Sequence, residues 1–367
     1  MFAISLAYDE IKGKVRQFIM QEEHTNFAEM AKMVFFYQYQ QNSPYRKYCR
    51  KRRVHPTSIQ DVTQIPPVPI QAFKETVLVC SPEEELERIF MTSGTTNPDK
   101  RGKNGHRDLE VYDLSATIFF KENMMPDVNN MKMVILFPAG KEMPHSSLAH
   151  YLQLMKNTFG TEDSEYVASE KGFDELRLKE ILAEAENKDE PVFLLGATFS
   201  FIHFLDTCKE EKLTFSLPAG SRVMDTGGAK GTSREVDPLE LKRQLSKLFS
   251  IPEYACGNMY GMTELSSQLY DQTLRLQGPK TLKKPPHWVK TTIVDPETMK
   301  EKPEGETGII VHYDLANFHS VAAVMTEDLG VKEGDSLYLL GRAEGAEVRG
   351  CSLAMESFLQ ADQGTAP

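Results

Sequence analysis

Short apolar runs alternate with helical patterns through the middle of the chain, and this order constrains the fold more than any other feature. Three strand-like runs stand at 132–138 (KMVILFP), 191–197 (PVFLLGA) and 221–228 (SRVMDTGG). Continuous apolar runs of this length are typical of buried strands. The segments between them have helical periodicity, as at 239–249. Strand-like segments predominate near the C-terminus, so we expect an α/β core followed by a β-rich part.

Composition excludes several classes of protein. The 367 residues include 42 Lys and Arg against 53 Asp and Glu, a net charge of −11, whereas nucleic-acid binders usually carry a basic excess. The longest apolar stretch, 191–205, falls below the roughly 18 residues of a membrane span. Five widely spaced cysteines without Cys-x-x-Cys argue against a disulfide framework or a zinc site. We expect a cytoplasmic protein with no transmembrane segment and no nucleic-acid partner.

The segment IFMTSGTTN at 89–97 is the sharpest candidate for a binding site. Its apolar start leads into serine, threonine and glycine residues, which offer many hydroxyls and backbone N–H groups in a short space. Successive N–H groups form concavities that accept phosphate oxygens. The Walker A pattern is absent. The alternative interpretation is an ordinary polar loop, because these residue types favour loops.

Two further segments carry groups suited to a nucleotide. In CGNMYGMTEL, Tyr260 offers an aromatic face, Thr263 a hydroxyl and Glu264 a carboxylate for Mg²⁺. The alternative places Thr263 at the N-cap of a helix and Tyr260 in the core. DTGGAKG at 225–231 is a glycine turn at a strand end, where open α/β sheets bind ligands.

Taken in order, these motifs resemble the adenylate-forming superfamily of acyl-CoA synthetases and luciferase-type enzymes. TSGTT resembles its phosphate loop, TGGAKG its adenine-side turn and YGMTE its Tyr-Gly-x-Thr-Glu motif. Thr326-Glu327-Asp328 resembles Thr-Gly-Asp, and Gly341-Arg342 the pair before the hinge. Within the superfamily the chain is most similar to the acyl-protein synthetase (LuxE-type) family, through YQYQQNSPY, IPPVPIQAFKE and RGCSL.

The resemblance implies a site that binds ATP and Mg²⁺. The loop is implied to contact the phosphates. The glycine turn and the YGMTE segment are implied to contact the base and the rest of the nucleotide, and Glu264 is implied to bind magnesium. Thr263 is implied to touch the α-phosphate, Asp328 to bind the ribose and Arg342 to lie near ribose or phosphate. The remaining implied ATP contacts are Thr92, Ser93, Gly94, Thr95, Thr96, Gly227, Gly228, Ala229, Tyr260 and Gly261.

The implied fold is the large domain of an adenylate-forming enzyme, with mixed sheets and a curtailed C-terminal subdomain. We expect this domain over 1–342 and a short tail over 343–367. Only 25 residues follow Arg342, too few for an independent subdomain. The family's C-terminal lysine and its coenzyme A tunnel are therefore expected to be missing. Lys230 is a candidate electrostatic substitute for that lysine.

The resemblance implies activation of a fatty acid to an acyl-adenylate and transfer to Cys351 as a thioester. Cys49 lies closer to basic residues, so only the RGCSL context selects Cys351. Implied partners are the reductase and acyl-transferase subunits of a fatty-acid reductase complex. Alternatives are an acyl- or aryl-CoA ligase using free coenzyme A, and a non-catalytic subunit that binds a partner through the basic stretch 46–53.

An acyl pocket has weaker signals. The apolar runs 132–138 and 191–205 either line such a pocket or form core strands, and the second interpretation is favoured. Polar side chains that are candidates for the same pocket are His145, Ser146, Ser147 and His203.

Overall fold

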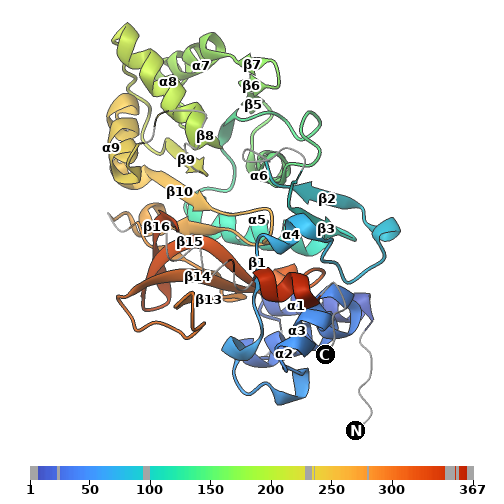
Figure 1. Ribbon diagram of the computed structural model, residues 1–367. Helices are drawn as coiled ribbons and strands as arrows, with labels where there is room; N and C mark the ends of the chain where they lie inside the picture. The colour runs from blue at the N-terminus through green and yellow to red at the C-terminus, as the bar shows by residue number, and fades with distance from the viewer. Residues whose placement is uncertain are drawn as a thin grey trace. The chain divides into compact units, whose positions relative to one another are not determined.

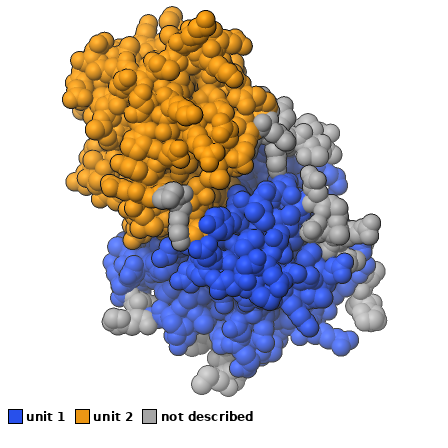
Figure 2. Space-filling model, turned by 90° about the vertical axis from the view of Figure 1, so that its left-hand side faces the viewer, with its two compact units in different colours: residues 1–116, 262–267, 284–367 blue, residues 117–261, 268–283 orange. Residues whose placement is uncertain are grey.

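The fold is a mixed α/β structure in two compact units. A computed structural model describes residues 7–22, 25–93, 100–227, 234, 236–278, 281–343, 352 and 355–361. Unit 1 comprises Met1–Ala116, Met262–Ser267 and Lys284–Pro367, and unit 2 comprises Thr117–Gly261 and Gln268–Lys283 (Figures 1 and 2). The boundary separates Gly261 from Met262, so the YGMTE motif contributes residues to both units.

Unit 2 is built on a largely parallel sheet. The strands β4 (Lys132–Leu136), β8 (Val192–Ala197), β9 (Arg222–Thr226) and β10 (Cys256–Tyr260) pair in parallel in that order. The strand β5 (Glu165–Tyr166) pairs with β4, and β11 (Leu269–Asp271) runs antiparallel to β10. The segments predicted as strands at 132–138, 191–197 and 221–228 are thus confirmed as β4, β8 and β9.

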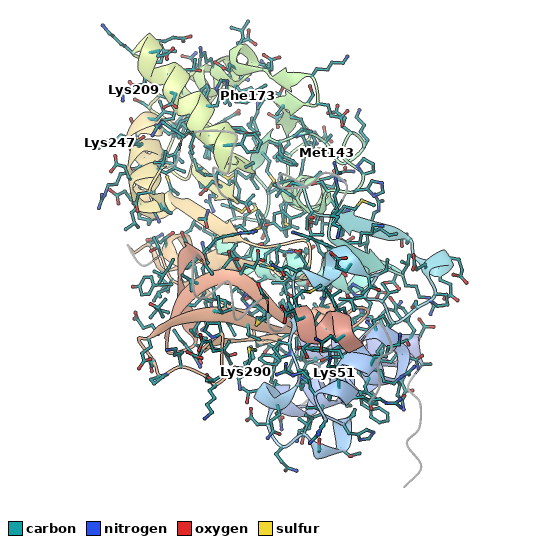
Figure 3. The ribbon with its side chains drawn as sticks, in the orientation of Figure 1. Lys51, Met143, Phe173, Lys209, Lys247 and Lys290 are labelled. Carbon is teal, nitrogen blue, oxygen red and sulfur yellow. The ribbon has the colours of Figure 1, made fainter. Side chains whose placement is uncertain are left out.

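Helices cover both faces of this sheet, which is why its strands β4 and β8 are almost entirely apolar. A buried cluster joins β4, β8 and β9 to α7 (Glu175–Lys188), α8 (Thr198–Glu211) and α9 (Pro238–Phe249). On the other face Phe120 of α5 (Glu110–Met124) stacks on Phe193 at 5.8 Å between ring centroids. Polar side chains lie at the ends of these helices. The Ser146 side chain caps the N-terminus of α6 (Ser147–Phe159). Lys209 and Lys247 lie exposed in the last turns of α8 and α9, where cations complement the helix dipole (Figure 3).

Unit 1 contains an antiparallel meander of four strands. These are β13 (Val289–Val294), β14 (Thr307–Asp314), β15 (Ala323–Glu333) and β16 (Ser336–Arg342), which confirms the expected β-rich part. The two-residue strand β1 (Val68–Pro69) pairs in parallel with β15. A separate hairpin pairs β2 (Arg88–Met91) with β3 (Lys103–His106).

The N-terminal helices complete unit 1. They are α1 (Tyr8–Ile19), α2 (Phe27–Gln41) and α3 (Ser43–Lys51). Helical residues 355–361 pack on α3, where the Phe358 ring lies 5.4 Å from that of Tyr48 and Lys51 (labelled in Figure 3) donates to Gln360. Within the basic stretch 46–53, Lys51 therefore bonds to another part of unit 1.

Two local predictions are wrong. Three prolines in five residues predict an extended segment or a loop over 65–75, yet the last four residues form α4 (Ala72–Glu75), because no proline stands between positions 70 and 75. The IPEYA segment, 251–255, is predicted as a strand, yet it contains the 3₁₀ turn η4 (Glu253–Ala255), and the strand is the following CGNMY. The remaining short elements are η1 (Pro56–Ser58), η2 (Val62–Gln64), η3 (Glu83–Glu85), β6 (Ala168–Ser169), β7 (Gly172–Phe173), α10 (Thr273–Leu276), β12 (Lys283–Lys284) and η5 (Leu315–Asn317).

Candidate active site

The base of the β2–β3 hairpin carries the first two residues of the predicted phosphate loop. Thr92 follows β2 directly, and its backbone amide donates to Gly102 O at 2.9 Å. The Gly102 amide donates in return to Thr92 Oγ1, also at 2.9 Å. Ser93 is exposed. The hairpin therefore fixes where the loop starts, while Gly94, Thr95 and Thr96 lie outside the described residues.

Glu264 lies against this hairpin base within unit 1. A Cβ built on Gly102 would stand 3.3 Å from Glu264 Oε1 and 3.1 Å from Thr92 Cγ2. Glu264 is only 5% exposed, and burial raises the pKa of its carboxyl to about 7, against opposing effects of Arg342 and Lys74. The structure thus brings the predicted magnesium ligand next to the start of the predicted phosphate loop.

Thr263 precedes Glu264 in a loop without helical structure. Its carbonyl accepts a 3.0 Å hydrogen bond from Asn104 Nδ2 on β3. Because no helix begins here, the alternative role of Thr263 as a helix N-cap is wrong. The backbone of this loop is therefore held by side chains from elsewhere in unit 1.

Asp328 and Arg342 are direct partners across β15 and β16. Arg342 Nη1 donates to Glu327 Oε2 at 3.0 Å, and Arg342 Nε lies 3.8 Å from Asp328 Oδ1. Glu327, which stands where the superfamily pattern has glycine, also accepts from Gln71 Nε2 at 2.5 Å. The pair is close enough to Glu264 for both charges to affect the pKa of its carboxyl.

Unit 2 holds the predicted base-side residues. Gly227 follows β9 and has a φ of +82°, a conformation that favours glycine. Tyr260 ends β10 and is 8% exposed, and Gly261 follows it. Since Thr226 pairs with Met259, the residues after the two strands emerge side by side. Gly228, Ala229 and Lys230 lie outside the described residues.

Polar side chains of unit 2 form a hydrogen-bonded row that starts at Asp225, two residues before Gly227, and that no sequence motif predicts. Asp225 Oδ2 accepts from Thr198 Oγ1 at 2.6 Å and from Asn258 Nδ2 at 3.0 Å. Lys283 Nζ donates to Asn258 Oδ1 at 2.6 Å and to Asp271 Oδ1 at 2.7 Å. Only Asp225 had a signal in the sequence, as the first residue of DTGG. The others come from separate strands and a helix, which local patterns do not connect.

Comparison with known proteins identifies the family. The sequence matches the acyl-protein synthetase (LuxE) family over residues 17–360. The chain belongs to the LuxE acyl-protein synthetase family. It is 24% identical over 366 residues to a long-chain-fatty-acid–luciferin-component ligase of Vibrio harveyi and 22% identical over 363 residues to one of Aliivibrio fischeri, each match covering 95% of this chain and 92% of the relative.

Solved structures show the same fold. An open conformation of 2-hydroxyisobutyryl-CoA ligase superposes with a TM-score of 0.60 at 14% identity, covering 92% of this chain and 76% of that one. ATP-bound MatB from Rhodopseudomonas palustris gives 0.51 at 17% identity, covering 72% and 49%. The predicted fold class is confirmed, and this LuxE-family chain is an AMP-forming acid ligase.

Four of the five cysteines of this LuxE-family chain are buried free thiols. Burial raises the pKa of Cys49 to about 12, of Cys208 to about 11 and of Cys256 to about 12, and it raises that of Cys80 as well. The thiolate is the nucleophilic form, so these four are poor nucleophiles. The basic neighbours of Cys49 do not overcome its burial. Cys351 lies outside the described residues.

A magnesium ion fits Glu264 only in company with a substrate. The described residues contain no cluster of three or more His, Cys, Asp or Glu side chains that could hold a metal. Mg²⁺, however, usually keeps several waters and is bound by one or two carboxylates together with substrate phosphates. Glu264 is a buried carboxylate without a recorded ion pair among the described residues. It therefore suits an ion that arrives with a polyphosphate.

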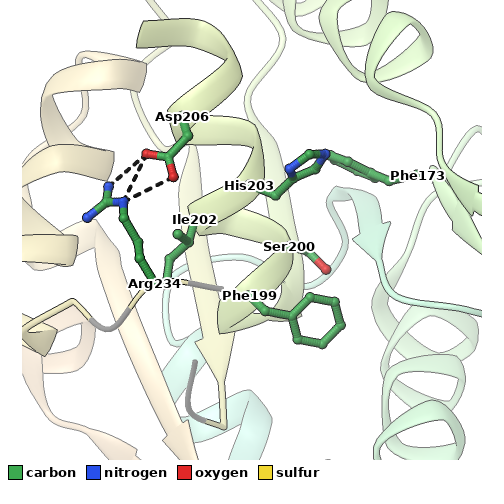
Figure 4. A pocket seen from close by; sticks show the side chains of 7 residues that line it. All are labelled: Phe173, Phe199, Ser200, Ile202, His203, Asp206 and Arg234. Atoms are coloured by element: carbon green, nitrogen blue, oxygen red, sulfur yellow. Dashed lines mark hydrogen bonds and ion pairs between the residues drawn. The ribbon is translucent and has the colours of Figure 1, made fainter. Parts of the chain in front are cut away.

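His203, a candidate residue of the acyl pocket, lines a cavity of about 290 Å³ along α8 (Figure 4). Its place in an acyl pocket stays a prediction. The other lining residues in the described chain are Phe173, Phe199, Ser200, Ile202, Asp206 and Arg234. Arg234 Nη2 donates to Asp206 Oδ1 at 2.8 Å.

By contrast, β4 and β8 are buried core strands, which confirms the favoured interpretation for the run 132–138 and for the first half of the run 191–205. The second half of that run is not a strand but the start of helix α8. No helix among the described residues meets the length and hydropathy of a bilayer span.

Proposed function

We propose that this chain activates a long-chain fatty acid with ATP and passes the acyl group to its own Cys351. Membership of the LuxE family and the names of the Vibrio harveyi and Aliivibrio fischeri relatives support a fatty-acid substrate. The observation that carries the proposal is the placement of Glu264 beside Thr92 at the hairpin base. A buried carboxylate next to a hydroxyl-rich loop suits a magnesium-bound polyphosphate.

In the first step, a carboxylate oxygen of the fatty acid attacks the α-phosphorus of ATP, and the bond to the pyrophosphate oxygen breaks. Thr92, Ser93 and the loop that follows hold the phosphates, and Thr263 contacts the α-phosphate. Glu264 would hold the Mg²⁺ ion, which would neutralise part of the phosphate charge. The chain itself contributes positioning and prearranged donors, which are the main sources of catalysis in phosphate chemistry.

The base and ribose of the nucleotide are assigned to two other sets of residues. Gly227, with Gly228 and Ala229, lines the adenine, and Tyr260 and Gly261 flank the nucleotide. Asp328 accepts hydrogen bonds from the ribose hydroxyls. Arg342, paired with Asp328 across the sheet, lies near ribose or phosphate.

In the second step, the Cys351 thiolate attacks the acyl carbonyl of the adenylate. The thiol first loses its proton to solvent; the thiolate sulfur then forms the C–S bond, the C–O bond to the phosphate breaks, and AMP leaves. The burial of the four other cysteines supports this choice by leaving Cys351 as the remaining acceptor. We place Cys351 in a C-terminal segment, 343–367, that follows an adenylation domain over 1–342 and delivers the acyl group to a reductase partner.

The test is self-acylation. Purified protein is incubated with Mg²⁺, ATP and radiolabelled tetradecanoate, and the label is followed on a denaturing gel. We expect ATP-dependent labelling that neutral hydroxylamine removes and that Cys351→Ser abolishes, with Cys208→Ser as the matched control that still labels. Labelling of Cys351→Ser would exclude that residue. Acyl transfer only to added coenzyme A would favour a CoA ligase, and absence of fatty-acid-dependent pyrophosphate–ATP exchange would favour a non-catalytic subunit.

A further inference from the structure

Asn317 is a completely buried amide whose hydrogen-bonding groups are all used. Its Nδ2 donates to Glu264 O at 2.9 Å and to Val321 O at 2.8 Å. Its Oδ1 accepts from Ser266 Oγ at 2.8 Å and from Asn104 Nδ2 at 3.2 Å. A primary amide offers two donors and two acceptor lone pairs, so this residue uses its full capacity.

The contacts of Asn317 join two parts of the candidate site. Asn104 stands on β3, two residues beyond Gly102, and Asn104 Nδ2 also lies 3.0 Å from Thr263 O. Glu264 and Ser266 belong to the loop that carries the predicted magnesium ligand. The Asn317 side chain therefore links the β2–β3 hairpin, where the predicted phosphate loop starts, to the backbone of Glu264.

The same loop is anchored at its far end. Asp314 Oδ2 accepts from the Ser266 amide at 2.9 Å, and Asp314 Oδ1 accepts from Ser267 Oγ at 2.7 Å. With Asn317 on one side and Asp314 on the other, the loop backbone has little freedom. A buried amide whose donors and acceptors are all used, as in Asn317, favours a single arrangement, and the loss of one partner leaves a buried polar group without compensation.

We propose that Asn317 is a positioning residue for adenylation: it holds the Glu264 backbone so that the carboxylate faces the phosphates beside Thr92. This inference rests on the proposed function of Glu264 as the magnesium contact. Asn317 itself touches neither nucleotide nor metal in this scheme. Loss of an outer partner of a metal ligand typically lowers metal affinity or activity by about 10- to 100-fold.

The variants are Asn317→Leu, which removes all four hydrogen bonds, and the milder Ser266→Ala, which removes one. Asn42→Leu is the matched control. Asn42 is also fully buried, and its Nδ2 bonds Ser320 O at 3.3 Å in the segment after Asn317, but no contact with the 263–266 loop is recorded among the described residues. It therefore reproduces the general cost of losing a buried asparagine.

Two readouts separate positioning from stability. The first is the Mg²⁺ concentration needed for half-maximal fatty-acid-dependent pyrophosphate–ATP exchange. The second needs no turnover: the rise in melting temperature caused by ATP with Mg²⁺, compared with ATP in EDTA. We expect Asn317→Leu to raise the Mg²⁺ requirement about 10-fold or more and to lose the magnesium-dependent part of the thermal shift, with a smaller change for Ser266→Ala.

The outcomes are distinct. If the Asn317 and Ser266 variants keep the Mg²⁺ dependence of Asn42→Leu, Asn317 is purely structural and the inference is overturned. If Asn317→Leu does not fold, Ser266→Ala decides the question by the same readouts. If the unaltered protein shows the magnesium-dependent thermal shift but no exchange, the proposed fatty-acid activation fails, while the thermal shift still tests Asn317. If it shows no such shift, the inference itself fails.

Discussion

Glu264 Oε1 lies 3.3 Å from the point where a Cβ on Gly102 would stand. The absence of a side chain at position 102 therefore creates the space in which the buried carboxylate lies beside Thr92. This contact connects two motifs that are more than 150 residues apart in the sequence. It also makes position 102 sensitive to the addition of a single methyl group.

Gly102→Ala should impair adenylation more than it impairs folding. Its methyl group would meet Thr92 Cγ2 at 3.1 Å and Glu264 Oε1 at 3.3 Å, so one of them must move by a few tenths of an ångström. We expect the rate of pyrophosphate–ATP exchange to fall about 10-fold or more, as misplacement of a catalytic group does.

The control for this prediction is Gly105→Ala on β3, three residues after Gly102. Its Cβ would meet Leu86 and Val79, not the site. We expect it to lower the melting temperature and leave exchange per folded molecule unchanged. Equal loss of exchange in the two variants would show that the hairpin, and not the position of Glu264, is what matters.

Glu264→Gln should lose exchange and gain stability. Burial raises the pKa of this carboxyl from 4.5 to about 7. The folded state therefore favours the protonated form, and that stabilisation is present below pH 4.5 and is lost as pH rises through about 7. At pH 8, without metal or nucleotide, a neutral glutamine avoids a cost of about 3 kcal/mol.

The measurement is chemical denaturation of both proteins from pH 5 to 8.5 in EDTA. We expect the free energies of unfolding to be closest at pH 5, to diverge in favour of Glu264→Gln as pH rises toward about 7, and to keep a nearly constant difference above it, while exchange falls at least about 100-fold. A difference in stability that does not change with pH would contradict the assignment.

Acid should destabilise unit 1 through two buried histidines. Burial lowers the pKa of His312 and of His319 from 6.5 to about 3. Each is neutral in the folded state, so stability is fully present above pH 6.5 and is lost as pH falls below it. At pH 5 the loss is about 2 kcal/mol for each histidine.

His319→Phe, which keeps a ring beside His106 (4.0 Å between ring centroids), should remove its share of this acid sensitivity. Denaturation at pH 7.5 and at pH 5 measures it, with the same change at the exposed His145 as control. If His319→Phe and unaltered protein lose equal stability on acidification, the buried ring is not the cause.

Phe358→Ala should separate the two proposed steps. Phe358 is 1% exposed and packs on Tyr48. It lies in the helical residues 355–361, which begin four residues beyond the proposed acceptor at position 351. Residues 351 and 355 are at most about 14 Å apart along the chain, so this packing limits the reach of Cys351. We expect exchange to be retained and self-acylation to slow by about 10-fold as orientation is lost.

The measurement is single-turnover labelling with radiolabelled tetradecanoate, beside pyrophosphate–ATP exchange on the same preparation. Phe215→Ala, a buried phenylalanine of unit 2, controls for general destabilisation. Unchanged labelling in Phe358→Ala would show that the packing on α3 does not serve the second step.

The sequence by itself determined the strands, the helices between them and the order of the motifs. β4, β8 and α9 were predictable because the pattern of apolar residues in each segment is local: it can be recognised from residues that are adjacent or a few positions apart in the sequence. Gly227 was predictable as a turn because its backbone conformation favours glycine. The proline-rich segment misled at Ala72–Glu75 because proline restricts only its own position and the one before it.

Only the tertiary structure decided which of these motifs meet. It assigned Tyr260 to one unit and Glu264 to the other, and it brought Asn104 and Asn317 together across 213 residues. Gly102 and Asn317 had no recognisable signal, because a glycine that makes room or an amide that bonds a distant carbonyl is defined by its partners. Such partners are chosen by packing and hydrogen-bond satisfaction of the whole unit, which no local pattern encodes.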